Sequence, residues 1–108
     1  MPLVSKGEDV TPEIIQKKLY TATRLLVHKI FVSLPAIQRY VDRLLAGDIA
    51  PAIKMDGNVI VDGNHRYIAA KILGLEPDVV PWVLPPNKVG MTKPIFDVKV
   101  DLADWGNK

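Results

Sequence analysis

The sequence predicts a small single α+β domain with a mixed β-sheet and flanking helices. Short runs rich in β-branched residues alternate with segments of helical periodicity, which is the pattern of such a fold. The chain has 108 residues, enough for one modest core, and 48% of them are hydrophobic, as in ordinary globular proteins. We therefore expect residues 1–108 to form one domain, with residues 1–10 and 101–108 as loose tails.

Two helices are expected in the first half of the chain. Thr11, followed by a proline and an acid, is typical of a helix start, and this helix should extend from about 12 to 21. A second helix should follow Ser33 and end at Gly47, because apolar residues between them recur at i, i+3, i+4, i+7 and i+8. Those residues are Ile37, Tyr40, Val41, Leu44 and Leu45.

Five short segments predict strands, namely 29–34, 53–55, 59–61, 77–84 and 95–100. Asp56-Gly57 separates the second segment from the third, which is typical of a β-hairpin. Pro81 places the fourth at a sheet edge, because proline has no N–H for a central ladder. The last segment alternates polar and apolar side chains, as a half-buried strand does.

The most informative segment is residues 59–74, VIVDGNHRYIAAKILG. Three β-branched residues predict a buried strand, Asp62-Gly63 predicts a tight turn, and the following run predicts a helix that ends at Gly74. The first N–H groups of a helix have no intrahelical acceptor, and the helix dipole is positive at that end. This helix start is therefore a candidate anion site, and phosphate is the anion that suits it best.

Three charged or titratable residues are candidate catalytic residues. Arg66 offers a planar bidentate donor for phosphate, the alternative being a surface arginine paired with an acid. His65 can transfer a proton, since the helix dipole favours its neutral form, although alone it would be an ordinary hydrogen-bonded histidine. Asp62 is either a turn residue or a carboxylate that holds Mg²⁺ or activates a water beside a triphosphate.

The predicted phosphate-binding set is Gly63, Asn64, His65 and Arg66. Gly63 permits the turn and a close approach of the phosphate to the backbone. Asn64 can cap the helix or hydrogen-bond a phosphate oxygen or a water. Tyr67 is expected to pack rather than to act as an acid.

The same segment carries a resemblance. The string GNHRY at residues 63–67, with alanines at 69–70 and a glycine at 74, resembles the signature helix of the ParB/sulfiredoxin superfamily. With Val61 and Asp62 included, it is most similar to the ParB-like domains at the C-termini of bacterial polymorphic toxins. The likeness is specific over residues 59–74 and looser from about 29 to 84.

The resemblance implies a ParB/sulfiredoxin-like fold, nucleotide binding and contact between Arg66 and the nucleotide phosphates. It also implies that the domain is the toxic part of a bacterial effector, neutralised in its producer by an immunity protein. Sulfiredoxins have a reactive cysteine, and chromosome-segregating ParB proteins a glutamate, where this chain has Asn64. Asn64 is no thiol, so sulfinic-acid reduction is excluded, and it cannot replace the charge of the glutamate.

Other positions have two interpretations each. Arg39 and Arg43, on the polar side of the second predicted helix, form a solvated face or, as the superfamily implies, help to hold phosphates. His28 and Lys29 precede a predicted strand and could line the same pocket. Trp82 follows Pro81 at the end of a predicted strand, where it would form the wall for a nucleobase or pack in the core.

These observations predict a nucleotide-binding domain that cleaves or transfers at a phosphoanhydride, with ATP as nucleotide and Mg²⁺ as metal ion. Such a nucleoside triphosphate hydrolase or phosphotransferase works mostly by positioning and charge neutralisation. Two alternatives stay open, a metal-dependent nuclease and a non-enzymatic nucleotide-gated binding module. The net charge of +2 disfavours the nuclease, because a duplex-binding protein normally neutralises several phosphates.

Composition excludes some further classes. The chain has no cysteine, so it uses neither disulfides nor thiolate chemistry. No apolar run approaches the ~20 residues of a membrane-spanning helix, and the N-terminus lacks the apolar core of a signal peptide. We expect a cytoplasmic protein; if it enters a target cell as part of a larger effector, the export signal lies outside this sequence.

Overall fold

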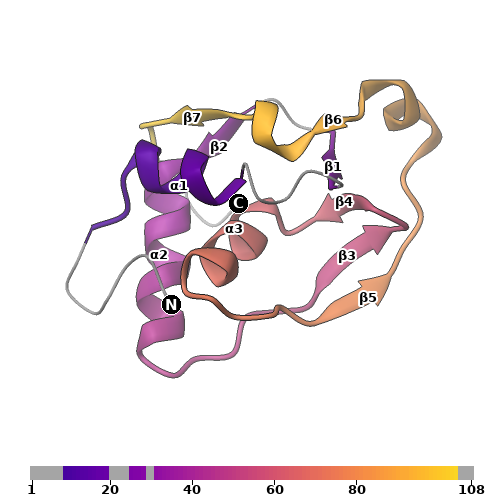
Figure 1. Cartoon of the computed structure of the whole chain (residues 1–108). Coiled ribbons are helices and arrows are strands. Elements are labelled where there is room, and N and C mark those ends of the chain that lie inside the picture. Colours follow the sequence, from indigo (N-terminus) through magenta and orange to yellow (C-terminus); the bar gives the residue numbers. More distant parts are fainter. Residues whose placement is uncertain (1–8, 20–24, 29–30, 105–108) are drawn as a thin grey trace.

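The computed structural model describes residues 9–19, 25–28 and 31–104 (Figure 1). Its α-helices are α1 (Pro12–Leu19), α2 (Leu34–Leu45) and α3 (Asn64–Ile72). The strands are β1 (Leu26–Val27), β2 (Phe31–Ser33), β3 (Ile53–Asp56), β4 (Val59–Asp62), β5 (Val79–Pro81), β6 (Lys93–Pro94) and β7 (Lys99–Asp101). Two 3₁₀ helices are η1 (Pro86–Met91) and η2 (Ile95–Asp97).

The predicted mixed sheet is present, with five strands in the order β5-β3-β4-β1-β6. β3 and β4 form the predicted antiparallel hairpin, whereas β5 and β1 run parallel to their partners β3 and β4. β6 pairs antiparallel with β1, and a separate two-stranded parallel sheet joins β2 to β7. The α-helices lie together on one side of the five-stranded sheet, where α3 contacts both α1 and α2 (Figure 1). The fold is thus a small α+β domain.

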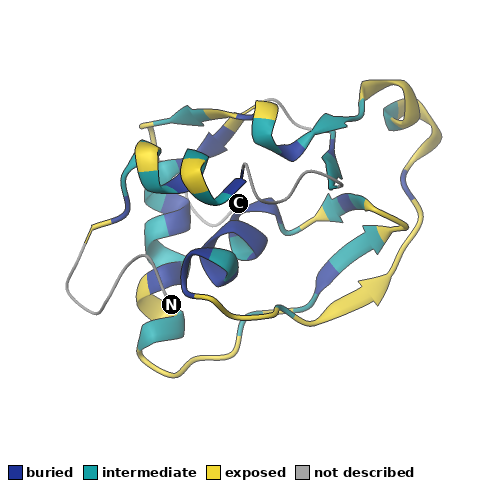
Figure 2. Cartoon of the chain, in the orientation of Figure 1, coloured by how far each residue is buried: buried dark blue, intermediate teal, exposed yellow. Residues whose placement is uncertain are grey.

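The core surrounds α3, the most deeply buried helix of the domain (Figure 2). Its apolar residues pack against side chains from α1, α2, the sheet and η2. The largest of the fully buried side chains are Ile15, Leu19, Ile37, Ile53, Ile60, Ile68, Ile72 and Ile95. Because α3 is fixed on several sides, its N-terminus has a defined position at the end of β4.

Both predicted helix starts are confirmed. The N–H of Ile14 donates to Thr11 Oγ1 (3.2 Å) at the start of α1, and the N–H of Ala36 donates to Ser33 Oγ (3.3 Å) at the start of α2. These contacts give the hydroxyls the capping role expected of them. Residues 20–21, where the first helix was expected to end, lie outside the described residues.

The strand predicted at 29–34 is confirmed over a shorter range, as β2. The structure has two short strands, β1 before this segment and β2 within it, and Leu34 already belongs to α2. Ser33 caps that helix, so the strand must end where the cap begins. Lys29 and Ile30 lie outside the described residues.

The strand predicted at 95–100 is wrong in its first half. η2 occupies Ile95–Asp97, and a strand begins only at Lys99. Ile95 and Val98 are the buried pair, at 0% and 2% exposure, and their spacing of three is helical rather than alternating. The segment predicted at 77–84 contributes the shorter strand β5, which lies at the sheet edge as Pro81 indicated.

The expected loose tails are in part ordered. Val10 is 3% exposed, and its N–H donates to Gln38 Oε1 (2.6 Å). At the other end Asp101 belongs to β7, and the carbonyl oxygen of Ala103 accepts a hydrogen bond from Ser33 Oγ (2.8 Å). Residues 1–8 and 105–108 of the two tails lie outside the described part of the chain.

Candidate functional site

The turn between β4 and α3 has the geometry that the motif predicts. Gly63 adopts φ +106°, ψ 26°, a left-handed conformation, and directly precedes the first helical residue, Asn64. A Cβ atom at Gly63 would lie 2.9 Å from Arg66 Nη2, so the guanidinium would have to shift. Glycine thus suits the left-handed backbone conformation and leaves space for the guanidinium that lies over the turn.

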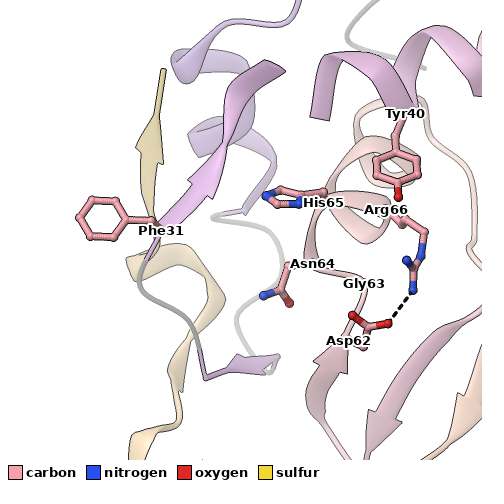
Figure 3. A pocket seen from close by; sticks show the side chains of 7 residues that line it. All are labelled: Phe31, Tyr40, Asp62, Gly63, Asn64, His65 and Arg66. Carbon is pink, nitrogen blue, oxygen red and sulfur yellow. Dashed lines mark hydrogen bonds and ion pairs between the residues drawn. The ribbon is translucent and has the colours of Figure 1, made fainter. Parts of the chain in front are cut away.

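Around this turn the structure brings the predicted site residues together. A small cavity of about 30 Å³ is lined by Phe31, Tyr40, Asp62, Gly63, Asn64, His65 and Arg66 (Figure 3). Five of the seven are the predicted catalytic and phosphate-binding residues. Phe31 from β2 and Tyr40 from α2 were not predicted to line it, because an aromatic residue in a strand or on an apolar helix stripe carries no sign of a site.

Arg66 is held in place by two acceptors. Its Nη2 donates to Asp62 Oδ2 (3.2 Å) and to the carbonyl oxygen of Ala52 (3.3 Å). Its Nε is buried and finds no acceptor in the described part of the chain. The ion pair of Arg66 with an acid, the alternative to phosphate binding, is present. Because the Asp62 side chain is 55% exposed, we expect this ion pair to be weak enough to open.

His65 is buried, at 8% exposure, and its Nε2 accepts the backbone N–H of Ser33 (2.9 Å). A nitrogen that accepts a hydrogen bond carries no proton. The contact joins the start of α3 to the start of α2. His65 therefore fixes the position of the helix start, and its Nε2 is not available for proton transfer while this bond persists.

Asn64 does not cap α3, in contrast to one of its predicted roles. Gly63 is the N-cap residue, and no side chain makes a capping hydrogen bond there. Asn64 is 9% exposed, and its Oδ1 is buried without a partner in the described part of the chain. Two residues that line the cavity thus each carry a buried, unpaired polar atom, the acceptor Asn64 Oδ1 and the donor Arg66 Nε.

Two larger hollows adjoin the small cavity. One, of about 360 Å³, shares Tyr40 with it and is also lined by Arg43 and the segment 48–51. The other, of about 240 Å³, shares Arg66 and lies against the same segment and residues 75–78. Arg43 therefore lines a hollow next to the site, as one of its two interpretations required.

The other secondary candidates lie elsewhere. Arg39 Nη1 donates to both carboxylate oxygens of Asp104 (2.7 Å each), and His28 Nε2 bonds the carbonyl oxygen of Val61 (2.9 Å). Neither side chain lines the small cavity. Trp82 is 50% exposed beneath Lys54 Nζ, 4.2 Å from the ring centroid, so it neither packs in the core nor forms a wall of these hollows.

Tyr67 packs in the core as expected. Burial, and to a smaller extent the charge of Glu76, raises the pKa of the Tyr67 phenol above its usual 10.0. The phenol is thus kept neutral, and it is not a candidate acid at ordinary pH.

The described residues hold no cluster of three or more His, Cys, Asp or Glu side chains that could bind a metal ion by themselves. Asp62 offers a single half-exposed carboxylate at the cavity. Magnesium is commonly held by one or two carboxylates together with substrate phosphates. Asp62 fits that kind of site, in which the nucleotide supplies most of the ligands.

Comparisons with protein-family models, curated proteins and solved structures find no significant match for this chain. The likeness to the ParB/sulfiredoxin superfamily thus stays a prediction that depends on residues 59–74. In the described part of the chain, no helix is long and apolar enough to cross a membrane.

Proposed function

We propose that this domain, in a ParB/sulfiredoxin-like fold, binds ATP with Mg²⁺ and cleaves the phosphoanhydride bond of the terminal phosphoryl group. The observation that carries the proposal is the start of α3. There the left-handed Gly63, the unpaired Arg66 Nε and the first N–H groups of the helix adjoin an open cavity. A turn packed beneath another element would have left no room for an anion.

The sizes of the hollows divide the ligand into two parts. A water needs about 10–15 Å³ of such volume, so a cavity of about 30 Å³ holds a few atoms and no nucleoside. We place one oxygen of the terminal phosphoryl group there and the nucleoside in the adjoining 360 Å³ hollow beyond Tyr40. Arg43 stands 5.7 Å from the centre of the Tyr40 ring, and its charge favours the inner phosphates.

Binding exchanges partners at Arg66. The terminal phosphate takes the place of Asp62 on the guanidinium, and Arg66 then stabilises the charge of the transferred phosphoryl group. The released Asp62 carboxylate faces the cavity and can accept a proton from the attacking group. Mg²⁺ bound with the nucleotide at Asp62 would neutralise phosphate charge. His65 acts by holding the start of α3 against α2.

Calorimetry of ATP with Arg66→Ala tests the binding half of the proposal. A charge-assisted hydrogen bond is worth about 1.5–3 kcal/mol, so ATP affinity should fall roughly 10- to 150-fold. Lys17→Ala removes the same charge from an exposed position on α1 and is the matched control; it should leave the affinity unchanged. Equal effects of the two substitutions would place the nucleotide elsewhere.

Phosphate release by Asp62→Asn tests the chemical half. This variant should lose Mg²⁺-dependent phosphate release, because an amide neither holds Mg²⁺ alone nor takes up a proton. It should still fold and bind ATP without metal, about two- to threefold more tightly because a carboxylate no longer repels phosphate. Unchanged turnover in this variant would exclude Asp62 from the chemistry.

A nucleotide-gated binding module without catalysis is the second candidate. Two observations favour it: Asp62 is paired with Arg66, and His65 Nε2 is occupied by the Ser33 amide, so both candidate proton acceptors are engaged. Measuring ATP binding and phosphate release on one sample separates the two functions. Saturable binding with no release would favour the module.

A further inference from the structure

We propose that Asn64 positions the attacking water, so that the site hydrolyses its nucleotide and does not transfer the phosphoryl group to a larger acceptor. This inference rests on the proposed function and adds to it the identity of the phosphoryl acceptor. The side-chain oxygen of Asn64 is buried and finds no donor in the described part of the chain. The sequence motif was compatible with Asn64 as a helix cap or as a partner of a phosphate oxygen or a water.

The chemistry of the two unpaired atoms calls for two different ligands. Arg66 Nε is a donor and is satisfied by a phosphate oxygen. Asn64 Oδ1 is an acceptor, and an ionised phosphate, which has only acceptors, cannot satisfy it. A buried acceptor without a donor is unfavourable. A second group beside the phosphate that carries an O–H would satisfy this acceptor.

The size of the cavity selects water as this second group. The cavity measures about 30 Å³, and its wall includes Asn64, which is 9% exposed. If one phosphoryl oxygen occupies part of this volume, the remaining space is about that of one water and is too small for an alcohol or a side chain with its carbon skeleton. The two larger hollows begin beyond Tyr40 and Arg66 and do not include Asn64 in their walls.

The step balances with water alone. The water donates one hydrogen bond to Asn64 Oδ1, which orients its oxygen toward the terminal phosphorus. The new P–O bond forms as the bond between that phosphorus and the β–γ bridging oxygen breaks, and ADP leaves with the bonding pair. The proton of the water passes to Asp62, whose side chain is 55% exposed and releases it to solvent. Asn64 keeps its protonation state, so it is a positioning residue.

Substitution of Asn64 tests this role through a ratio of products. With ATP in buffer containing methanol, wild type should release inorganic phosphate and almost no methyl phosphate. Asn64→Ala removes the acceptor and enlarges the cavity, so kcat should fall about 100-fold with KM for ATP little changed, and the share of methyl phosphate should rise. Asn64→Asp keeps an oxygen acceptor at this place and should recover part of the lost hydrolysis, with a higher KM for ATP because its charge repels phosphate. A merely structural role would lower both products in parallel, and that result would overturn the proposal.

A second experiment does not depend on turnover. In a crystal structure with Mg²⁺ and the β,γ-imido analogue of ATP, a water should lie within hydrogen-bond distance of Asn64 Oδ1 and in line with the terminal phosphorus. An analogue bound without such a water, or a Mg²⁺ ion on Asn64 Oδ1, would overturn the role of Asn64 and leave the proposed nucleotide site standing. Failure of the analogue and of ATP to bind would overturn the proposed function, and this inference with it.

Discussion

Gly63 shows how one residue can serve the backbone and the site together. Its φ of +106° is outside the range that L side chains adopt easily, and a Cβ there would meet the Arg66 guanidinium. Gly57 is a matched position in the hairpin turn, with φ +58° and no atom within 4 Å of a built Cβ. The pair separates the cost of a left-handed backbone from the cost of displacing Arg66.

Gly63→Ala should therefore destabilise the protein more than Gly57→Ala, for which we expect about 1–2 kcal/mol. Only Gly63→Ala should also weaken ATP binding, because it displaces the guanidinium that contacts phosphate. Urea unfolding and calorimetry on both variants give these quantities. If both variants bound ATP as wild type does, the position of Arg66 over the turn would be irrelevant to the ligand.

The buried phenol of Tyr67 predicts a stability loss at high pH. Its pKa is raised in the folded state, so the unfolded chain loses this proton first as pH rises. The contribution of Tyr67 to stability is fully present below about pH 10, the pKa of an exposed phenol, and is lost as pH rises through the folded pKa. Wild type should therefore lose more stability than Tyr67→Phe between pH 9 and pH 11 in parallel urea titrations. Identical pH profiles would show that the phenol ionises as freely in the folded state as in the unfolded chain.

The elements that the sequence predicts well are those set by neighbouring residues. The hairpin β3–β4, the starts of α1 and α2 and the turn into α3 each depend on a cap or a glycine within a few residues. β1 and β2 could not be located in this way. β1 has two residues and pairs with β4 and β6, which are distant along the chain. Such pairing leaves no local pattern, so the sequence predicted a strand at 29–34, which contains β2, and none at β1.

The side chain of Ser33 connects the start of α2 to the C-terminal segment by two hydrogen bonds. It is fully buried; its Oγ accepts from the Ala36 N–H and donates to the carbonyl oxygen of Ala103, 70 residues away. Ser33→Ala should cost about 1–2 kcal/mol for the cap and about 1 more for the second hydrogen bond. Thr11→Ala removes only a cap, from α1, and should cost about 1 kcal/mol in the same urea unfolding experiment. Equal losses would mean that the contact with Ala103 adds nothing to stability.

At the scale of the whole molecule, the site combines a local motif with walls from distant segments. The polar residues 62–66 were predictable, because a strand, a turn and a helix start place them together by sequence alone. The contributions of Phe31 and Tyr40 to the cavity wall and the bond from Ser33 to His65 depend on how β2 and α2 pack against α3. No local pattern around His65 indicates that its Nε2 accepts the Ser33 N–H.

The overall charge disfavours the last alternative, the nuclease. With a net charge of +2, and with Arg39 and Arg66 both paired with carboxylates, the protein offers little attraction to a polyanion. Even non-specific duplex binders reach dissociation constants of about 10⁻⁴–10⁻⁶ M at physiological salt by neutralising several phosphates. We expect no saturable binding of a labelled duplex or single-stranded RNA in that range by fluorescence anisotropy, at any salt concentration from 50 to 200 mM.

ATP binding by the same sample is the positive control, because it would show that the protein is folded and active. A duplex that bound with a steep salt dependence, and bound less tightly to Arg66→Ala than to Lys17→Ala, would identify nucleic acid as the ligand of the α3 site. Metal-dependent cleavage would then take the place of nucleotide hydrolysis. A single triphosphate needs only the few donors at one helix start, whereas a duplex needs an extended positively charged surface. The weak net charge of this chain therefore fits the triphosphate better than the duplex.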